Sequence, residues 1–205
     1  TIEGVDSLKE ITYKPIYDRV EAGTFMVAAA ITNSKITING ANEDHLRPTI
    51  EKLKECGVIF KNIKEDTILV DGTGVKIPVD IKTLPYPGFP TDMQAQMMTL
   101  LSVTKGSSII TETVFENRFM HVAELVRMGA NIKIDGRTAI IEGVGALTGC
   151  DVKATDLRAG AAMILAGLVA QGRTEISELY HIDRGYENIE EKFRGLGANI
   201  YRVEK

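Results

Sequence analysis

The sequence predicts an α/β protein made of three copies of one unit, with buried helices at its centre and sheets outside. Three markers recur along the chain at similar spacing. An aspartate opens an apolar helix at Asp18, Asp92 and Asp156. A glycine ends a second helix and begins a strand at Gly57, Gly129 and Gly197. Segments 2–5 and 141–144 both read Ile-Glu-Gly-Val, and 69–72 is a degraded copy. Independent markers at one period indicate an internal repeat.

Each unit is predicted to contain a helix, a strand, a second helix and two further strands. The first helices are apolar almost all round, which is typical of a buried helix, and cover Thr24–Ile31, Met97–Val103 and Ala159–Val169. The second helices are amphipathic and are expected at the surface, as in Glu51–Glu55 and Glu187–Phe193. We therefore expect a single domain over residues 1–205, with units at about 12–73, 85–144 and 150–205.

The two ends of the chain break this regularity. Thr1–Val5 reads as a strand that precedes the first unit, and Ile200–Val203 reads as a last strand with no partner after it. Either Thr1–Val5 closes the last sheet or an edge stays open, and an open edge is a pairing hazard.

The stretch from Phe89 to Arg118 places an acid and a guanidinium at the ends of two neighbouring elements. Pro90 and Thr91 mark the start of a helix with Asp92 in its first turn, and Met93, Met97, Leu100 and Leu101 follow at helical spacing. Alternation at Ile110, Glu112 and Val114 then predicts a strand that finishes at Glu116–Arg118.

Composition limits the partners of this chain. Its 28 acidic and 24 basic residues give a net charge of −4, so the chain lacks the overall positive charge that is typical of nucleic-acid-binding proteins. The longest apolar run, Ala159–Ala170, is shorter than the roughly 18 residues that suggest a membrane span. Cys56 and Cys150 do not form a disulfide framework, so we expect a reducing, cytoplasmic location.

No common catalytic or cofactor motif is present in the sequence. There is no P-loop, no G-x-G-x-x-G, no H-E-x-x-H, no C-x-x-C and no G-x-S-x-G. The three histidines, His45, His121 and His181, are dispersed and lack metal-ligand spacing. We expect neither a metal nor a cofactor.

Two interpretations of Asp92 are open. An aspartate in a first helical turn commonly caps orphan amides, and Asp18 and Asp156 occupy the same place in their units. Alternatively, the helix dipole favours a carboxylate that accepts a proton from a hydroxyl. Only Asp92 follows a stiff Phe-Pro approach, which would fix its position.

The arginines also have two interpretations. Arg118 and Arg184 follow strands at matching positions of their units, and each stands beside an acidic residue with which it could form a weak surface pair. Alternatively, the threefold arrangement brings Arg118, Arg184, Arg19 and Arg158 to one rim, where they receive phosphate or carboxylate.

Three long motifs carry a resemblance to a known family. Segments 89–96, 111–121 and 180–187, together with 154–159 and 18–25, closely resemble the UDP-N-acetylglucosamine 1-carboxyvinyltransferases. The likeness covers nearly the whole chain but only the C-terminal half of that enzyme. It implies an inside-out α/β barrel of three repeated units, one of two similar domains with the active site in the cleft between them.

The resemblance also implies a reaction. Enolpyruvate moves from phosphoenolpyruvate to the sugar 3-hydroxyl by addition and elimination of phosphate, without a metal, in peptidoglycan synthesis. Asp92 would bind this hydroxyl and take its proton, Val114 would touch the nucleotide sugar, and Arg184 would face the phosphate. The remaining matched positions are expected to bind substrate without an assigned role: Asp156, Arg118, Arg158 and Arg19.

The chain departs from this family where its partner domain would be. The family's Gly-Gly-Cys loop, whose cysteine donates a proton, is absent, and Cys56 and Cys150 lie in no such motif. We therefore expect this half to be inactive without the N-terminal domain. Two alternatives are a non-catalytic binding or scaffold module, and enolpyruvyl transfer to shikimate 3-phosphate. The motifs around Asp92 and Arg118 argue against the second.

Overall fold

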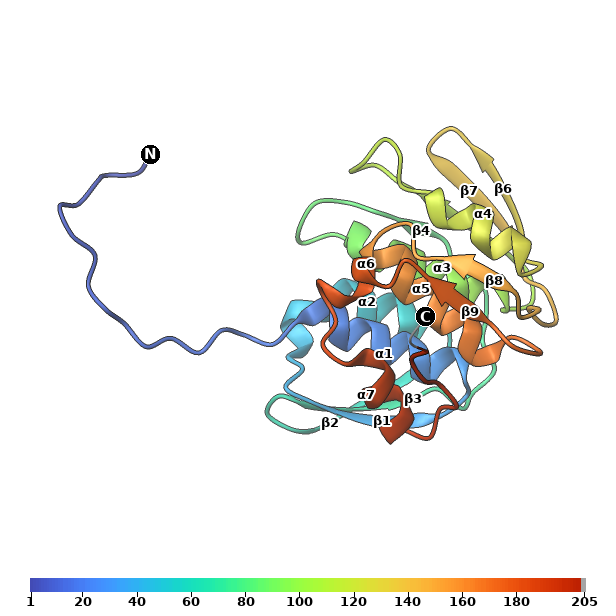
Figure 1. Cartoon of the computed structure of the whole chain (residues 1–205), viewed down its shortest axis with the longest axis horizontal. Helices are drawn as coiled ribbons and strands as arrows, with labels where there is room; N and C mark the ends of the chain where they lie inside the picture. Colours follow the sequence, from blue (N-terminus) through green and yellow to red (C-terminus); the bar gives the residue numbers. More distant parts are fainter. Residues whose placement is uncertain (204–205) are drawn as a thin grey trace.

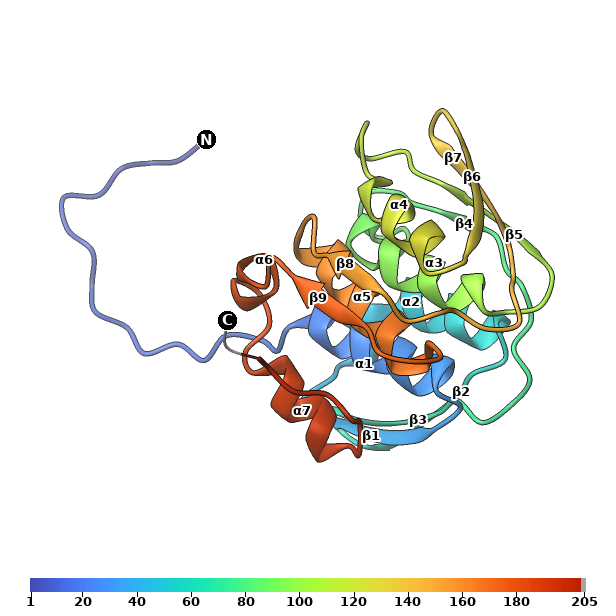
Figure 2. The ribbon, with the colours of Figure 1, turned by 45° about the vertical axis from the view of Figure 1, so that its right-hand side comes forward.

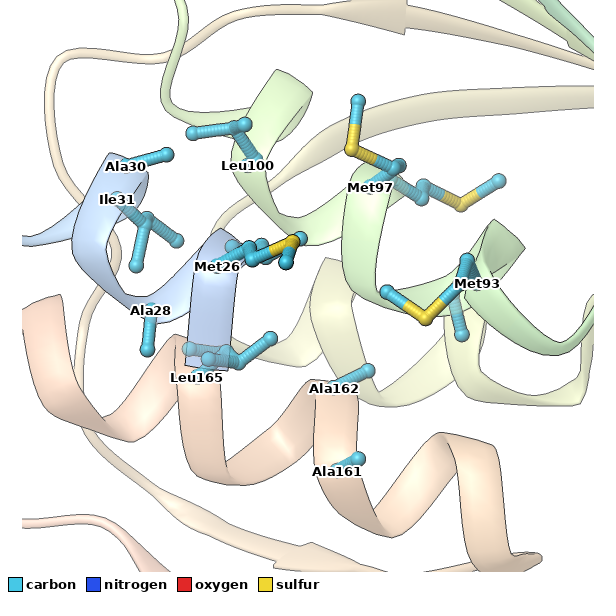
Figure 3. Close-up of a cluster of buried hydrophobic side chains, with 14 of the residues drawn as sticks. Met26, Ala28, Ala30, Ile31, Met93, Met97, Leu100, Ala161, Ala162 and Leu165 are labelled. Carbon is cyan, nitrogen blue, oxygen red and sulfur yellow. The ribbon is translucent and has the colours of Figure 1, made fainter. Parts of the chain in front are cut away.

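A computed structural model describes residues 1–203 and places three helices at the centre of the body (Figure 1). They are α1 (Arg19–Ile31), α3 (Gln94–Ser102) and α5 (Leu157–Val169). Each of them contacts the other two. Figure 3 shows side chains from all three meeting, among them Met26, Met97 and Leu165, which are fully buried. The prediction of three buried helices is confirmed.

The first unit has the predicted order of elements. After α1 come β1 (Lys35–Asn39), α2 (Glu43–Glu55), β2 (Ile59–Lys64) and β3 (Thr67–Asp71). The sheet order is β1-β3-β2, with β3 antiparallel to both neighbours. Helix α2 is amphipathic as expected, and it buries Leu46, Ile50 and Leu53 while its other face meets water.

The second unit has the same order with one strand added in front. Its elements besides α3 are β4 (Ile81–Lys82), the 3₁₀ helix η1 (Thr91–Met93), β5 (Ser107–Thr111), α4 (Met120–Arg127), β6 (Asn131–Asp135) and β7 (Thr138–Glu142). The four strands of this unit form one sheet in the order β4-β5-β7-β6. Strand β5 ends at Thr111, so the expected continuation to Arg118 is wrong. The carboxylate of Glu112 accepts hydrogen bonds from the amides of Val114 and Phe115, which turns the chain into a loop.

The third unit is incomplete within the described residues. It contains β8 (Asp151–Lys153), α5, β9 (Glu175–Ser177), α6 (Tyr180–Asp183) and α7 (Ile189–Gly195). Its sheet holds only the parallel pair β8-β9. The expected strand at Ile200–Val203 is wrong because no strand equivalent to β3 or β7 is there to pair with it. Arg202 instead binds Asp183 and Glu190.

The first 18 residues form neither helix nor strand, and the chain before residue 14 runs away from the body (Figures 1 and 2), while residues 14–18 lie beside the start of α2. The expected strand at Thr1–Val5 is therefore wrong, since no neighbouring strand pairs with its backbone. Its apolar side chains, such as Ile2 and Val5, are exposed.

Glycines end the second helices as predicted. Gly57, Gly129 and Gly197 have φ of +96°, +93° and +96°, the left-handed conformation of a helix C-cap. Across residues 1–203, no helix combines the length and apolar character that crossing a membrane requires.

Candidate active site

Asp92 lies in contact with two arginines that come from distant parts of the chain. Its Oδ1 atom is 2.8 Å from Nε and 2.6 Å from an Nη of Arg158, and 3.3 Å from an Nη of Arg118. Asp92 sits in η1, Arg118 in the loop before α4, and Arg158 in the first turn of α5. The fold therefore joins the second and third units at this acid.

The three equivalent aspartates have different hydrogen bonds. Asp18 caps α1 by accepting from the amides of Val20 and Glu21, and Asp156 caps α5 by accepting from those of Arg158 and Ala159. Asp92 makes no capping bond. All its contacts use Oδ1, and within residues 1–203 its Oδ2 has no hydrogen-bond partner. The capping interpretation thus fits Asp18 and Asp156 and fails for Asp92.

Arg118 is held by its own loop. Its guanidinium lies 4.8 Å from the centre of the Phe115 ring, a cation–π contact, and its side chain is only 16% exposed. The neighbouring Glu116 pairs with Arg137 instead. The expectation of a surface pair between Arg118 and its neighbour is therefore wrong.

Arg184 lies at the same end of α5 as Arg158. A Cβ on Gly160 would lie 2.3 Å from Ile182, and a Cβ on Gly185 would lie 2.6 Å from Leu157, so α6 and its following turn pack directly on the first turns of α5. The side chain of Arg184 is exposed, and no carboxylate within residues 1–203 forms an ion pair with it. Its expected position at a strand exit, matching Arg118, is wrong because Arg184 follows the helix α6.

A buried polar contact ties the turn after α6 to α1 and α3. The hydroxyl of Tyr186 is 2.9 Å from that of Thr24, which also accepts a hydrogen bond from Gln96 Nε2 at 3.2 Å. Burial raises the pKa of Tyr186 to about 12, so this hydroxyl stays protonated near neutrality. The amino-terminal halves of α1 and α3 thus meet at Tyr186, and the packing of α6 and its following turn on the first turns of α5 brings the start of α5 to the same end of the body.

Arg19 and Val114 lie outside the Asp92 contacts. Arg19 is the exposed first residue of α1 and lines a hollow between residues 14–18 and the start of α2. Within residues 1–203, no hydrogen bond or ion pair joins Arg19 to Asp92. Val114 is 38% exposed in the loop that leads to Arg118. The geometry brings Asp92, Arg118 and Arg158 together but does not bring Arg19 to them.

Two buried residues of this region were missed by sequence reasoning. Glu112 is 1% exposed, and its position two residues after the buried Ile110 was a signal that it faces inward. His121 is 2% exposed and lies in α4. The pKa of His121 is lowered to about 4, mainly by burial; the Asp156 carboxylate opposes this shift and the charge of Arg118 adds to it. The sequence placed His121 at the end of the 111–121 motif, but no pattern indicated that its side chain is buried.

No group of three or more metal-ligating side chains converges within the part of the chain that the structure describes.

Relatives with high sequence identity share one name. The chain is 67% identical to UDP-N-acetylglucosamine 1-carboxyvinyltransferase 1 of Clostridium perfringens and 65% identical to UDP-N-acetylglucosamine 1-carboxyvinyltransferase 2 of Clostridium tetani. Each match covers 98% of this chain and 48% of the relative. The chain therefore spans about half the length of the curated relatives it matches. The resemblance stated from the motifs is confirmed.

Solved structures with the same α/β fold support this relationship. The enolpyruvyl transferase NikO from Streptomyces tendae aligns with a TM-score of 0.81 and 29% identity, over 90% of this chain and 44% of that one. EPSP synthase from Acinetobacter baumannii aligns with a TM-score of 0.62 and 20% identity, over 83% of this chain and 43% of that one. The second likeness shows the fold alone.

The family itself follows from the profile that matches the sequence. The profile of EPSP synthase (3-phosphoshikimate 1-carboxyvinyltransferase) covers residues 1–193, which is most of the chain. Together with the repeated units and the acid between two arginines, this match shows that the chain belongs to the EPSP synthase family.

Proposed function

We propose that this chain is half of a UDP-N-acetylglucosamine 1-carboxyvinyltransferase and supplies the base and several anion-binding groups of its active site. The single observation that carries the proposal is Asp92. Its Oδ1 is bound by Arg118 and Arg158, while its Oδ2 has no partner within residues 1–203 and its side chain is 25% exposed. The names of the relatives supply the substrate.

In the proposed reaction, Asp92 Oδ2 accepts the proton of the sugar 3-hydroxyl. The hydroxyl oxygen then forms a bond to carbon 2 of phosphoenolpyruvate, and a proton is added at carbon 3. Elimination breaks the bond from carbon 2 to the phosphate oxygen and removes a proton from carbon 3, which leaves the enol ether. The acid for carbon 3 is expected from the other half, where the resemblance places a cysteine.

The arginines are proposed to bind the anionic donor. A guanidinium carries five N–H donors. Asp92 uses one nitrogen of Arg118 and two of Arg158, so both retain donors for phosphate or carboxylate. Arg184, unpaired with any described carboxylate, is assigned to the phosphate. Val114 is proposed to contact the nucleotide sugar. Asp156 and Arg19 are also proposed to contact substrate, and only the sequence motifs support these two.

The other half is the proposed partner of this chain. Its chain is expected to complete the two-stranded third sheet, so that three sheets surround the central helices as an inside-out barrel of three units. It would also supply the opposite wall of the cleft. This role places the protein in the cytoplasm, in peptidoglycan synthesis for cell-wall growth, cell shape and division, without nucleic acid or membrane as a partner.

Transfer to shikimate 3-phosphate is the second candidate, and the name of the matching family profile is the observation that favours it. A test supplies phosphoenolpyruvate with either acceptor and measures phosphate release. A full-length enzyme carrying this sequence should release phosphate with UDP-N-acetylglucosamine, and the chain alone should not. Release only with shikimate 3-phosphate would reverse the assignment. Turnover by the chain alone would show that the second half is dispensable. Tight binding of UDP-N-acetylglucosamine by a chain without turnover would favour a self-sufficient binding module.

A further inference from the structure

We infer that Glu112 is a positioning residue that sets the distance between Asp92 and Arg118, an inference that rests on the proposed function. Within residues 1–203, its side chain forms no hydrogen bond or ion pair with either of them. It is 1% exposed and hydrogen-bonds to the segments that carry them.

Four donors surround the Glu112 carboxylate. Oε1 accepts from the Thr83 hydroxyl at 2.8 Å, from the Val114 amide at 2.8 Å and from the Phe115 amide at 3.1 Å. Oε2 accepts from the Thr91 hydroxyl at 2.8 Å. Within residues 1–203, no lysine or arginine pairs with this carboxylate. A buried carboxylate without a cation is costly unless hydrogen bonds satisfy it, and here two hydroxyls and two amides do so.

The donors come from three segments that converge on the site. Thr91 is in η1, immediately before Asp92. Val114 and Phe115 lie in the loop that leads to Arg118, and the Phe115 ring supports the Arg118 guanidinium. Glu112 therefore fixes the turn that holds the acid and the loop that holds the arginine.

Thr83 fixes this carboxylate to the sheet. Its hydroxyl donates to Glu112 and accepts from the amide of Thr113 at 2.9 Å, while the Thr113 hydroxyl donates to the Thr83 carbonyl oxygen. Thr83 directly follows β4, which pairs with β5. The segments that carry Asp92 and Arg118 are therefore both held in position relative to β4 and β5.

The Thr91 hydroxyl offers the sharpest test, because its bond to Glu112 links that carboxylate to the turn of Asp92. Within residues 1–203, this hydroxyl forms no other hydrogen bond. Thr91→Val keeps the shape and removes this bond, whereas Thr91→Ser retains it. In the full-length enzyme we expect Thr91→Val to lower kcat roughly 10- to 100-fold, with less than about a threefold change in KM for the sugar nucleotide. Thr91→Ser should restore most of the rate.

Glu112 itself is tested by Glu112→Gln and Glu112→Ala. Gln keeps an oxygen for three of the donors, and the Thr91 hydroxyl can rotate to accept from the new amide. We expect kcat to fall in the order wild type, Gln, Ala. The matched control is Glu142→Ala, because Glu142 is an exposed strand glutamate that accepts one hydroxyl, from Ser107, and should leave kcat unchanged.

Hydrogen exchange gives a readout that does not depend on turnover. In Glu112→Ala, the amides of Val114 and Phe115 should exchange at least about tenfold faster, with the amides of α3 unchanged. If Glu112→Ala does not fold, the kcat values of Thr91→Val and Thr91→Ser still test the inference. Normal kcat in Thr91→Val, or unchanged exchange of the Val114 and Phe115 amides in Glu112→Ala, would overturn the inference. A wild-type enzyme without transferase activity would refute the proposed function, and exchange alone would then judge whether Glu112 anchors the loop.

Discussion

The second copy of the repeat differs from the other two in what its aspartate does. Asp18 and Asp156 stand immediately before α1 and α5 and accept hydrogen bonds from the first amides of those helices. Asp92 stands two residues before α3, in the 3₁₀ turn η1, and binds two arginines instead. An aspartate at one place in the repeat thus caps a helix in the first and third copies, whereas in the second copy it keeps a carboxylate oxygen that has no hydrogen-bond partner within residues 1–203.

The cause of this difference is a shift in helix start. In the first and third copies, the aspartate is the N-cap itself, so its carboxylate faces the amides two and three residues on. In the second copy, the N-cap of α3 is Met93, and Asp92 lies one residue earlier. Its carboxylate is therefore not directed at the α3 amides.

The largest expected effect separates the two roles directly. Asp92→Asn keeps size and polarity but provides no carboxylate to take a proton, so kcat of the full-length enzyme should fall by about 10²- to 10⁴-fold. Asp18→Asn is the matched control because asparagine caps helices as well as aspartate does, and its kcat should be unchanged. Phosphate release under saturating substrates measures both. A near-normal rate for Asp92→Asn would remove Asp92 from the chemistry.

A smaller effect concerns His121, which lies near Arg118 of the second copy and Asp156 of the third. Burial lowers its pKa from 6.5 to about 4, so the unfolded chain binds a proton more readily than the folded one between these values. The contribution of neutral His121 to stability is complete above pH 6.5 and is lost as the pH falls towards 4, by roughly 3 kcal/mol in all.

Urea unfolding at pH 7 and pH 5 tests this contribution in the wild type and in His121→Gln. The difference in free energy of unfolding between the two pH values should be larger in the wild type by about 2 kcal/mol, since other titrating groups cancel in the comparison. An equal pH dependence in the two proteins would show that His121 is protonated as easily in the folded chain as in the unfolded one.

The smallest effect measures the cap itself. Asp18→Ala removes the acceptor for two amides and should lower the free energy of unfolding by about 1 kcal/mol, while Asp18→Asn should change it by only a few tenths. Asp92→Ala should cost less than Asp18→Ala, because no helix amide loses its partner and the ion pairs that it removes are partly exposed and therefore weak. Thermal unfolding of the three variants checks this order. If Asp92→Ala were the most destabilising, the distinction drawn between the copies would fail.

The sequence predicted those parts of the fold that local pattern determines. Apolar periodicity and repetition were enough to place the three buried helices, the order of elements in the first two units and the glycines at the helix ends. The strands at Thr1–Val5 and Ile200–Val203 were predicted wrongly, because a strand depends on a partner that the alternation of its own residues does not reveal.

Asp92, Arg118 and Arg158 of the candidate site could be picked out from the sequence, but their contacts could not. The aspartate and the arginines stand out in the motifs, yet the ion pair from Asp92 to Arg158 depends on how α3 and α5 pack. The burial of Glu112 likewise depends on donors that Thr83 and Thr91 bring from other segments. Such contacts require the assembled tertiary structure.

The convergence of α1, α3 and α5 beside Tyr186 has a consequence for the electrostatics of this end of the body. Each helix brings a partial positive charge at its amino terminus, so repeating one unit around an axis gathers three of them at a single pole. Three copies of one unit packed around an axis therefore favour anions at this end through backbone geometry that the copies share.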